Sequence, residues 1–346
     1  MIYAVKEKPF KFRLLYSALF IIGFYTWALL KAAQVTLPSP QTPLIFYSNQ
    51  KRQDLRLTFR KAIESAQHSI HITMYAVTDP LILKWLKKQS EKKIAVTLYF
   101  DPSAGHIDSA PFFEATPLKA QGLMHKKILI IDDQLVFLGS ANMTTSSLVL
   151  HDNLTVGFHS SELANFLKNP LFYQPYVPRK KIDFPSSLSF KIGNQNACLW
   201  LLPDKAGQAL AQLIQEIHSA SQTISLAMFT LTHPQLIEAL ICAKKRGVEV
   251  RVCLDFYAGR GASHKAVKRL KEENIPILFS QEGPLLHHKW ALIDHKTLIV
   301  GSTNWTQSAF KKNQDCLLFL KELSSPQEAY LKNLWHILVS EGRVIP

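Results

Sequence analysis

The sequence predicts an α/β protein made of two similar halves and preceded by one N-terminal transmembrane helix. Three observations predict this. The chain repeats itself at a nearly constant offset, apolar β-type runs alternate with stretches of helical period, and an uncharged apolar run follows basic residues near the N-terminus. Strands that alternate with helices are typical of α/β sandwiches.

Composition supports a chain with a large core and an anionic partner. The 346 residues are enough for two domains, and 47% of them are hydrophobic while 19% are charged. The formal net charge of +14 favours phosphate, nucleic acid or an acidic membrane surface as a partner. This charge gives no information about the fold.

The first element is the apolar run at residues 14–30. At ~1.5 Å per residue a helix over this run reaches roughly 25 Å, and its flanks extend it toward the ~30 Å of a hydrocarbon core. Because the positive charge precedes the run, we expect an uncleaved anchor with the N-terminus in the cytoplasm and the rest of the chain exported to the periplasm or another extracytoplasmic space. A cleaved signal peptide, which would make the protein secreted, is the alternative. The flanking basic residues are Lys6, Lys8, Lys11, Arg13 and Lys31.

An internal repeat follows the apolar run. SIHITMYAVTDPLI at 69–82 matches TISLAMFTLTHPQL at 223–236, and IAVTLYFD at 94–101 matches VEVRVCLD at 248–255, both at an offset of 154 residues. We expect the two copies to pack as a pseudo-dimer about an approximate two-fold axis.

Each copy contains the same order of elements. In the first copy, a helix-period stretch at 55–66, a second helix at 80–90 and a β-type run ending at Asp101 lead through a loop to a further β pattern. The offset grows to 162 residues across this loop, so the second copy carries eight additional residues there. The expected organisation is a basic segment and anchor at 1–34, a linker at 35–43, a first half at 44–169, a proline-rich linker at 170–197 and a second half at 198–346.

A histidine motif follows in each copy. MHKKILIIDDQLVFLGSANMT and LHHKWALIDHKTLIVGSTNWT share H-x-K, an Asp five residues after the Lys, and G-S-x-N. An ordinary surface position explains one such histidine, but packing hardly explains two copies with equal spacing and different neighbours. The motif residues are His125, Lys127, Asp132, Ser140 and Asn142 in the first copy and His287, Lys289, Asp294, Ser302 and Asn304 in the second.

The residues of each motif predict a β-hairpin that leads into a helix. The apolar run after Lys127 is typical of a strand buried on both faces, and Asp132 begins a turn. A His and a Lys two residues apart in a strand point to the same face. Two copies that face each other would bring two imidazoles, two ammoniums and two amides around one point, which is an anion site with a nucleophile and an acid.

The doubled pattern H-x-K-x4-D-x6-G-S-x-N resembles the phospholipase D superfamily, from residue 44 to about residue 335. The resemblance implies two α/β/α halves with the active site at their interface. It also implies a phosphohistidine intermediate and a reaction that needs no metal and no other cofactor.

The chemistry of a phosphodiester suggests a role for each motif residue. Amines and amides offset the developing negative charge, while one histidine attacks phosphorus and the other protonates the leaving oxygen. For the two aspartates, structural support of the histidine loops is preferred over direct participation, because each begins a turn. The candidate catalytic residues are His125, Lys127, Asp132, His287, Lys289 and Asp294, and the candidate phosphate-binding residues are Asn142, Asn304, Ser140 and Ser302.

The two copies differ behind the histidines. In the resembling family an acidic residue about 28 positions after the His holds the second ring nitrogen. At that position the second copy has Asp315 and the first has Asn153. We therefore expect Asp315 to orient His287 and Asn153 to lie behind His125. Because an anion favours the charged ring, this arrangement makes His125 the nucleophile and His287 the acid.

The expected function is a phospholipase D-type phosphodiesterase that hydrolyses phospholipid head-group esters, with head-group exchange left open. One chain is expected to suffice for activity, with phospholipid as substrate and the membrane contacted through the N-terminal helix. A cardiolipin synthase-like phosphatidyltransferase carries the same signature. A metal-independent nuclease acting on nucleic acid is the other alternative, supported by basic residues in the second copy, namely Arg260, Lys265, Lys268, Arg269 and Lys271.

The cysteines form no C-x-x-C pair, and buried free thiols are the preferred interpretation, although a disulfide stays open. The four cysteines are Cys198, Cys242, Cys253 and Cys316.

Overall fold

The computed structural model describes residues 9–32, 35–177 and 185–344. The chain divides into two compact units, residues 1–36 and residues 37–346. The first unit contains helix α1 (Pro9–Ala32), and the second contains all the other described helices and strands.

The predicted membrane anchor is wrong. Crossing a bilayer takes about 20 predominantly apolar residues in one helix. Within the described ranges, no helix combines that length with that apolar character. The exported location was inferred from this anchor alone, so that prediction is wrong as well.

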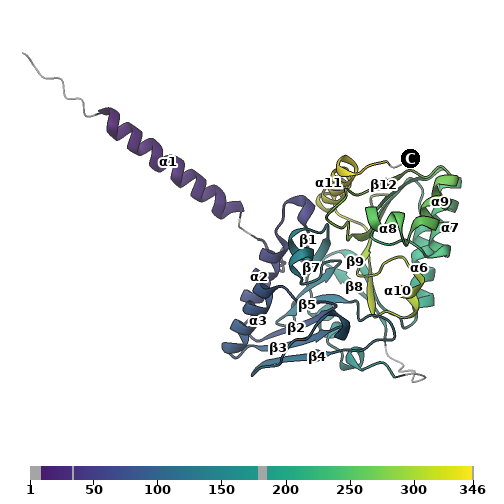
Figure 1. Cartoon of the computed structure of the whole chain (residues 1–346), viewed down its shortest axis with the longest axis horizontal. Coiled ribbons are helices and arrows are strands. Elements are labelled where there is room, and N and C mark those ends of the chain that lie inside the picture. Colours follow the sequence, from purple (N-terminus) through teal and green to yellow (C-terminus); the bar gives the residue numbers. More distant parts are fainter. Residues whose placement is uncertain (1–8, 33–34, 178–184, 345–346) are drawn as a thin grey trace, which may run out of the picture. The chain divides into compact units, whose positions relative to one another are not determined.

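The first half is built on a seven-stranded sheet with the order β1-β7-β6-β5-β2-β3-β4. Strands β2, β3 and β4 are parallel, and the others pair antiparallel. Figure 1 shows α2 and α3 on the outer side of this sheet. The strands are β1 (Leu44–Ser48), β2 (Ser69–Met74), β3 (Ala95–Phe100), β4 (Phe113–Pro117), β5 (Lys127–Ile131), β6 (Leu135–Gly139) and β7 (Leu154–His159). The helices are η1 (Asn49–Lys51), α2 (Leu55–Ser65), α3 (Pro80–Glu91), η2 (Pro102–Ala104), α4 (Thr145–Val149), α5 (Ser161–Leu167) and η3 (Pro170–Tyr173).

The second half repeats this plan on an eight-stranded sheet with the order β12-β11-β10-β13-β14-β15-β9-β8. Its outer side carries α6, α7 and α9 (Figure 1). The strands are β8 (Ser187–Ile192), β9 (Gln195–Leu202), β10 (Thr223–Met228), β11 (Glu249–Leu254), β12 (Ile277–Phe279), β13 (Lys289–Ile293), β14 (Thr297–Gly301) and β15 (Asp315–Leu320). The helices are α6 (Ala206–Ser219), α7 (Pro234–Lys245), α8 (Phe256–Arg260), α9 (His264–Glu272), α10 (Gln307–Lys311) and α11 (Ser325–Glu341).

Local sequence explains these elements. All five residues of β5 and all five of β13 are buried, as expected for apolar strands covered on both faces. Helix α3 starts where the Asp79 carboxylate accepts hydrogen bonds from two backbone N–H groups of the first turn, with Pro80 at the first helical position. The turn between β5 and β6 has positive φ at Asp132 and Asp133, the conformation that a type I′ hairpin turn requires.

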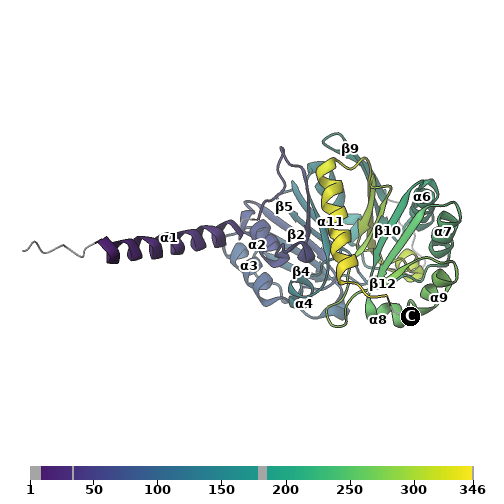
Figure 2. The ribbon, with the colours of Figure 1, turned by 90° about the horizontal axis from the view of Figure 1, so that it is seen from above.

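One hydrophobic cluster of the core spans both halves. The inner faces of both sheets contribute to a single cluster that includes Ile130 and Leu138 of the first half and Leu292 and Val300 of the second. Figure 2 shows α11 lying across the junction. This helix joins the halves, because the Tyr330 hydroxyl donates a hydrogen bond of 2.7 Å to the Gln53 side chain. Burial of this shared surface fixes the relative position of the two histidine motifs.

The second half begins earlier than predicted. Residues 170–197 were expected to be a linker, but they contain η3, all of β8 and the start of β9. Strands β8 and β9 form an antiparallel hairpin at the edge of the second sheet. Phe190 and Ile192 of strand β8 are buried and follow the two-residue period of a strand. The linker prediction overlooked this period because it relied on the prolines of the segment.

The four cysteines are free thiols. Cys253 and Cys316 are buried as predicted, and Cys198 is half-buried. Cys242 is exposed, so the prediction of burial is wrong for this residue. It lies in α7, whose buried residues include its neighbours Ile241 and Ala243.

Candidate active site

The two histidine segments cross from one half to the other. The backbone N–H of His125 donates to the backbone carbonyl of Gln314 at 2.8 Å, and the backbone N–H of His287 donates to the backbone carbonyl of Asp152 at 2.9 Å. Each histidine therefore lies beside the residue that precedes Asp315 or Asn153 in the opposite half. Both histidines are 8% exposed, so they are buried at the junction with little access to water.

The side chains behind the histidines are exchanged relative to the prediction. Asp315 contacts His125, with 2.8 Å between Oδ1 and Nδ1, and Asn153 contacts His287, with 3.1 Å between the same atoms. The expectation that each residue orients the histidine of its own half is wrong. The reason is the crossing of the backbones, which a count of positions along one copy does not reveal.

Both hydrogen bonds leave Nε2 of the ring as the reactive atom. The Asn153 amide nitrogen donates to the carbonyls of Ser147 and His151 at 2.9 and 3.1 Å, so its oxygen faces His287 and accepts from Nδ1–H. A carboxylate can only accept, so His125 also carries its proton on Nδ1. Burial acts to raise the pKa of Asp315, but His125 and Lys127 nevertheless hold it below its ordinary value, so Asp315 is ionised.

Ser140 and Ser302 were expected to bind phosphate, but their hydroxyls face the residues that orient the histidines. The Ser140 hydroxyl donates to Asn153 Oδ1 at 2.8 Å, and the Ser302 hydroxyl donates to Asp315 Oδ1 at 2.5 Å. A hydroxyl has one donor, and in both serines it is already used. The preceding residue Gly139 is required here because a Cβ would collide with the carbonyl of Leu154. The G-S part of the motif therefore supports the residues that orient the histidines.

Two buried lysines lie beside the histidines. Lys127 Nζ donates to the carbonyl of His125 at 2.7 Å, and Lys289 Nζ donates to the carbonyl of His287 at 2.9 Å. Both residues are 2% exposed, and neither has a carboxylate within ion-pair distance among the described residues. Burial lowers the pKa of Lys127 to about 7, and burial together with Lys127 lowers the pKa of Lys289 well below its ordinary value. A site with these properties favours an anionic ligand, which would stabilise both ammoniums.

The same two lysines also change the pKa values of the histidines. Burial, and then Lys127, lowers the pKa of His125, although Asp315 opposes this. Burial, and then Lys289 and Lys127, lowers the pKa of His287 well below its ordinary value. Both rings are therefore neutral at pH 7 before an anion binds. A bound phosphodiester would offset the ammonium charges and raise the proton affinity of both rings.

Asn142 and Asn304 each have an amide oxygen that is buried and has no hydrogen-bond partner in the described part of the chain. Rotation about χ2 exchanges the amide oxygen and nitrogen, so either group is able to face a ligand. Their role in phosphate binding stays a prediction.

Asp132 and Asp294 hold turns together. The Asp132 carboxylate accepts hydrogen bonds of 2.8 to 2.9 Å from the N–H groups of residues 67–69, and Asp294 accepts bonds of 2.8 Å from those of residues 221–223. These bonds tie each hairpin turn to the start of β2 or β10. The geometry supports the structural role that the sequence favoured for these aspartates.

Sequence reasoning missed two kinds of residue that shape the site. Tyr75 lies at 5.6 Å from the His125 ring and Phe229 at 5.2 Å from the His287 ring, measured between centroids. Asp101 and Asp255 accept hydrogen bonds from the N–H groups of the residues just before the two histidines, at 2.6 and 3.1 Å. The members of each pair are 154 residues apart, so the repeat offset contained the signal that could have found them.

The chain is similar to proteins of known families. A family model described as "Cardiolipin synthase, PLD-like domain" matches residues 59–170 and 213–335. Mitochondrial cardiolipin hydrolase of Mus musculus is 32% identical over 116 residues, which cover 33% of this chain and 51% of the relative. The Xenopus laevis protein of the same name is 30% identical over 158 residues, which cover 43% and 73%. The chain spans about half the length of most of these relatives.

The fold has a wider match. Phosphatidylserine synthase of Haemophilus influenzae superposes with a TM-score of 0.66 over 92% of this chain and 91% of that structure. The sequences are 13% identical, so this likeness concerns the fold alone.

Proposed function

Because this chain belongs to the phospholipase D superfamily, in the family described as "Cardiolipin synthase, PLD-like domain", we propose that it hydrolyses the head-group esters of phospholipids through a phosphohistidine intermediate. The observation that carries the proposal is the pair of buried histidines with their Nδ1 atoms held by Asp315 and Asn153. Two lysines without carboxylate partners among the described residues flank them.

Binding of the diester uses the positive charge of the site. The ammonium groups of Lys127 and Lys289 each donate one hydrogen bond to a backbone carbonyl. Their remaining N–H groups are able to donate to the non-bridging oxygens of the phosphate. The buried surroundings strengthen these contacts, and the lysines stabilise the charge that develops as the bond breaks. Asn142 and Asn304 are proposed to add amide donors.

In the first step His125 Nε2 attacks phosphorus while the bond to the leaving alcohol oxygen breaks. His287, protonated on Nε2 in the complex, gives this proton to the alcohol. In the second step a water molecule attacks phosphorus, His287 takes the proton from this water, and the phosphorus–nitrogen bond returns its electrons to His125. Both histidines regain their starting states.

His125 is again proposed as the nucleophile, as in the sequence analysis, but the reason is now different. The phosphorylated His125 ring carries a proton on Nδ1 and is positively charged for the whole life of the intermediate. The ionised Asp315 lies 2.8 Å from this Nδ1 and would stabilise that charge. His287 has to lose and regain its proton in each cycle, and the neutral Asn153 amide favours neither state strongly.

The names of the relatives support a lipid substrate, since they include cardiolipin hydrolases and a Rickettsia prowazekii phospholipase D that is 29% identical over 121 residues. Of the basic residues that favoured a nuclease, Arg269 donates to Glu238 at 3.2 Å and to Glu273 at 2.7 Å. Its charge is therefore compensated by neighbouring acids.

The family description favours phosphatidyl transfer as the second candidate. A transferase and a hydrolase would share the first step and differ in whether an alcohol or water attacks the phosphohistidine. The apolar residues that precede the two histidines in the sequence do not distinguish the two reactions, because Phe113, Leu118 and Leu286 belong to the core while Phe112 is 55% exposed.

The test uses the purified full chain with radiolabelled phosphatidylcholine, phosphatidylglycerol or cardiolipin in mixed micelles, and with single-stranded DNA, all in EDTA. We expect released head group and phosphatidic acid, a new phosphatidyl ester when glycerol is added at high concentration if transfer also occurs, and no cleavage of DNA. His125→Ala should abolish turnover, whereas His68→Ala, a substitution at an exposed histidine, should not. Cleavage of DNA but not lipid would reject the lipid assignment, and loss of activity in EDTA with recovery on adding a divalent ion would reject the mechanism.

A further inference from the structure

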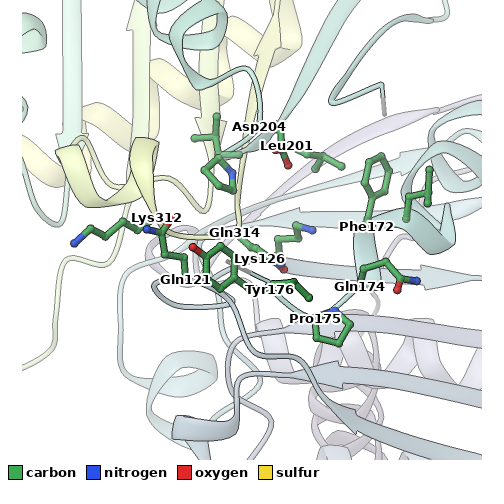
Figure 3. A pocket seen from close by; sticks show the side chains of 14 residues that line it. Gln121, Lys126, Phe172, Gln174, Pro175, Tyr176, Leu201, Asp204, Lys312 and Gln314 are labelled. Atoms are coloured by element: carbon green, nitrogen blue, oxygen red, sulfur yellow. The ribbon is translucent and has the colours of Figure 1, made fainter. Parts of the chain in front are cut away.

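A cavity of about 230 Å³ lies on the other side of the His125 backbone from the candidate active site. It is enclosed by the segment at 171–177, the end of β9 and the residues before β15 (Figure 3). Lys126 lines it. Side chains alternate along an extended segment, so Lys126 points away from the face that carries His125 and Lys127.

Lys126 is buried without an ion-pair partner among the described residues, although the more distant carboxylates of Asp204 and Asp315 favour its charged form. It is 4% exposed, and in the described part of the chain its ammonium has no hydrogen bond and no ion pair. Its close neighbours include the rings of Phe172 and Tyr173, whose centroids lie 5.7 and 5.9 Å from Nζ. Burial lowers the pKa of Lys126 to about 8, so it still carries its charge at pH 7. A buried charge that lacks a partner is costly, and a ligand anion would remove this cost.

The rest of the lining fits an anion with an apolar body. Gln314 lines the cavity and has a side-chain oxygen that is buried without a partner among the described residues. Rotation about χ3 would exchange this oxygen for the amide nitrogen, which would then donate a hydrogen bond to an anion. Phe172, Leu201 and Pro175 provide apolar walls (Figure 3). Asp204 also lines the cavity but does not lie within ion-pair distance of Lys126, and its carboxylate disfavours ligands with more than one negative charge.

The matching place in the second half has the opposite character. At the offset of 162 residues His288 replaces Lys126 and Asp152 takes the place of Gln314. The cavity there has a volume of about 180 Å³ and is lined by Asp152 and Glu341. His288 is neutral, because burial lowers its pKa to about 3, and it bonds to Gln50 at 2.8 Å. At this pair of matching positions, the first half therefore has a buried cation and the second half has a neutral ring.

We propose that the cavity around Lys126 binds a small organic monoanion, a carboxylate on an apolar body, with the carboxylate against Lys126 and Gln314. This site is distinct from the one that holds the phosphodiester, and its occupancy does not depend on the proposed reaction. A ligand there would contact both backbone segments that position His125, since the His125 N–H donates to the Gln314 carbonyl.

The test uses 4-bromobenzoate and the full chain. Isothermal titration should detect one site, and Lys126→Met should weaken binding at least about tenfold, the size expected for loss of one charged hydrogen bond. Lys126→Arg should bind more tightly than Lys126→Met, and Lys87→Met, at an exposed lysine, should bind like the wild type. The neutral 4-bromobenzyl alcohol should bind more weakly than the acid.

A soaked crystal of the wild type gives an answer that does not depend on the folding of any variant. The anomalous signal of bromine should lie in the Lys126 cavity. A bromine position between His125 and His287, no binding at millimolar concentration, or equal affinity of the acid and the alcohol would overturn the proposal.

Discussion

The two halves carry the same motif on the same arrangement of strands, yet they differ directly behind the reactive histidines. His125 of the first half is held by a carboxylate and His287 of the second by an amide, and in both cases the orienting residue comes from the other half. Neither half alone therefore contains both a histidine and the residue that orients it. The carboxylate that distinguishes the two rings comes from the opposite half, so the proposed roles of the two histidines depend on how the halves pack together.

The largest expected effects, and the clearest test of the difference between the two histidines, come from replacing each histidine in turn. His125→Ala should abolish turnover of every substrate, because no nucleophile remains. His287→Ala should slow an ordinary phosphodiester by about 10² to 10⁴, the usual contribution of a general acid. It should slow the first turnover of a 4-nitrophenyl phosphodiester much less, since that leaving group needs no proton. Rapid-quench measurement of the nitrophenol burst checks this, and equal loss for both substrates would contradict it.

The two lysines should contribute nearly equally. Each has the same bond to the backbone and the same burial, so Lys127→Met and Lys289→Met should each lower kcat by about 10² to 10³, as for the loss of one donor to a developing charge. The measurement is steady-state kinetics on one diester with both variants. A loss confined to one lysine would show that the phosphate lies within one half and does not bridge the two.

Asp315→Asn would make the two halves alike. Removing the carboxylate should lower turnover about 10- to 100-fold, as for other residues that orient a ligand or base. Asp315 raises the pKa of His125, so its loss should lower that pKa. Because His125 reacts in its neutral form, the rising acid limb of the profile of kcat/KM against pH should then move to lower pH. A shift to higher pH would mean that the limb belongs to another group.

Asp294→Asn should have the smallest effect on kcat and should mainly lower the free energy of unfolding. Although burial acts to raise the pKa of Asp294, hydrogen bonds from backbone N–H groups hold it below its ordinary value. Its ionised form therefore stabilises the fold at neutral pH, and this contribution is lost as the pH falls through the folded-state pKa. Urea unfolding should show a loss of roughly 1–3 kcal/mol at pH 7 that shrinks at low pH. A large loss of kcat in fully folded protein would instead place Asp294 in the chemistry.

The sequence predicted the parts of the site that depend on local pattern. The repeat located both motifs, and the apolar run after Lys127 predicted the buried strand β5. The partners of the histidines could not be predicted, because the crossing of the segments at Met124 and Gln314 depends on how two distant parts pack. The Ser140 and Ser302 hydroxyls donate to Asn153 and Asp315 of their own half, and the sequence pattern does not show in which direction a hydroxyl points. Spacing shows that residues recur together but not which neighbour each side chain faces.

The most direct test of the account is to locate the phosphohistidine. The wild-type chain is mixed with a labelled phospholipid, quenched without acid and digested, and the labelled peptide is identified by mass spectrometry, with Asp315→Asn treated in parallel. The account predicts label on His125 in both proteins, with a smaller amount in the variant because the positive ring has lost its carboxylate. Label on His287 in the wild type would contradict it, since the ring held by the neutral Asn153 would then be the nucleophile.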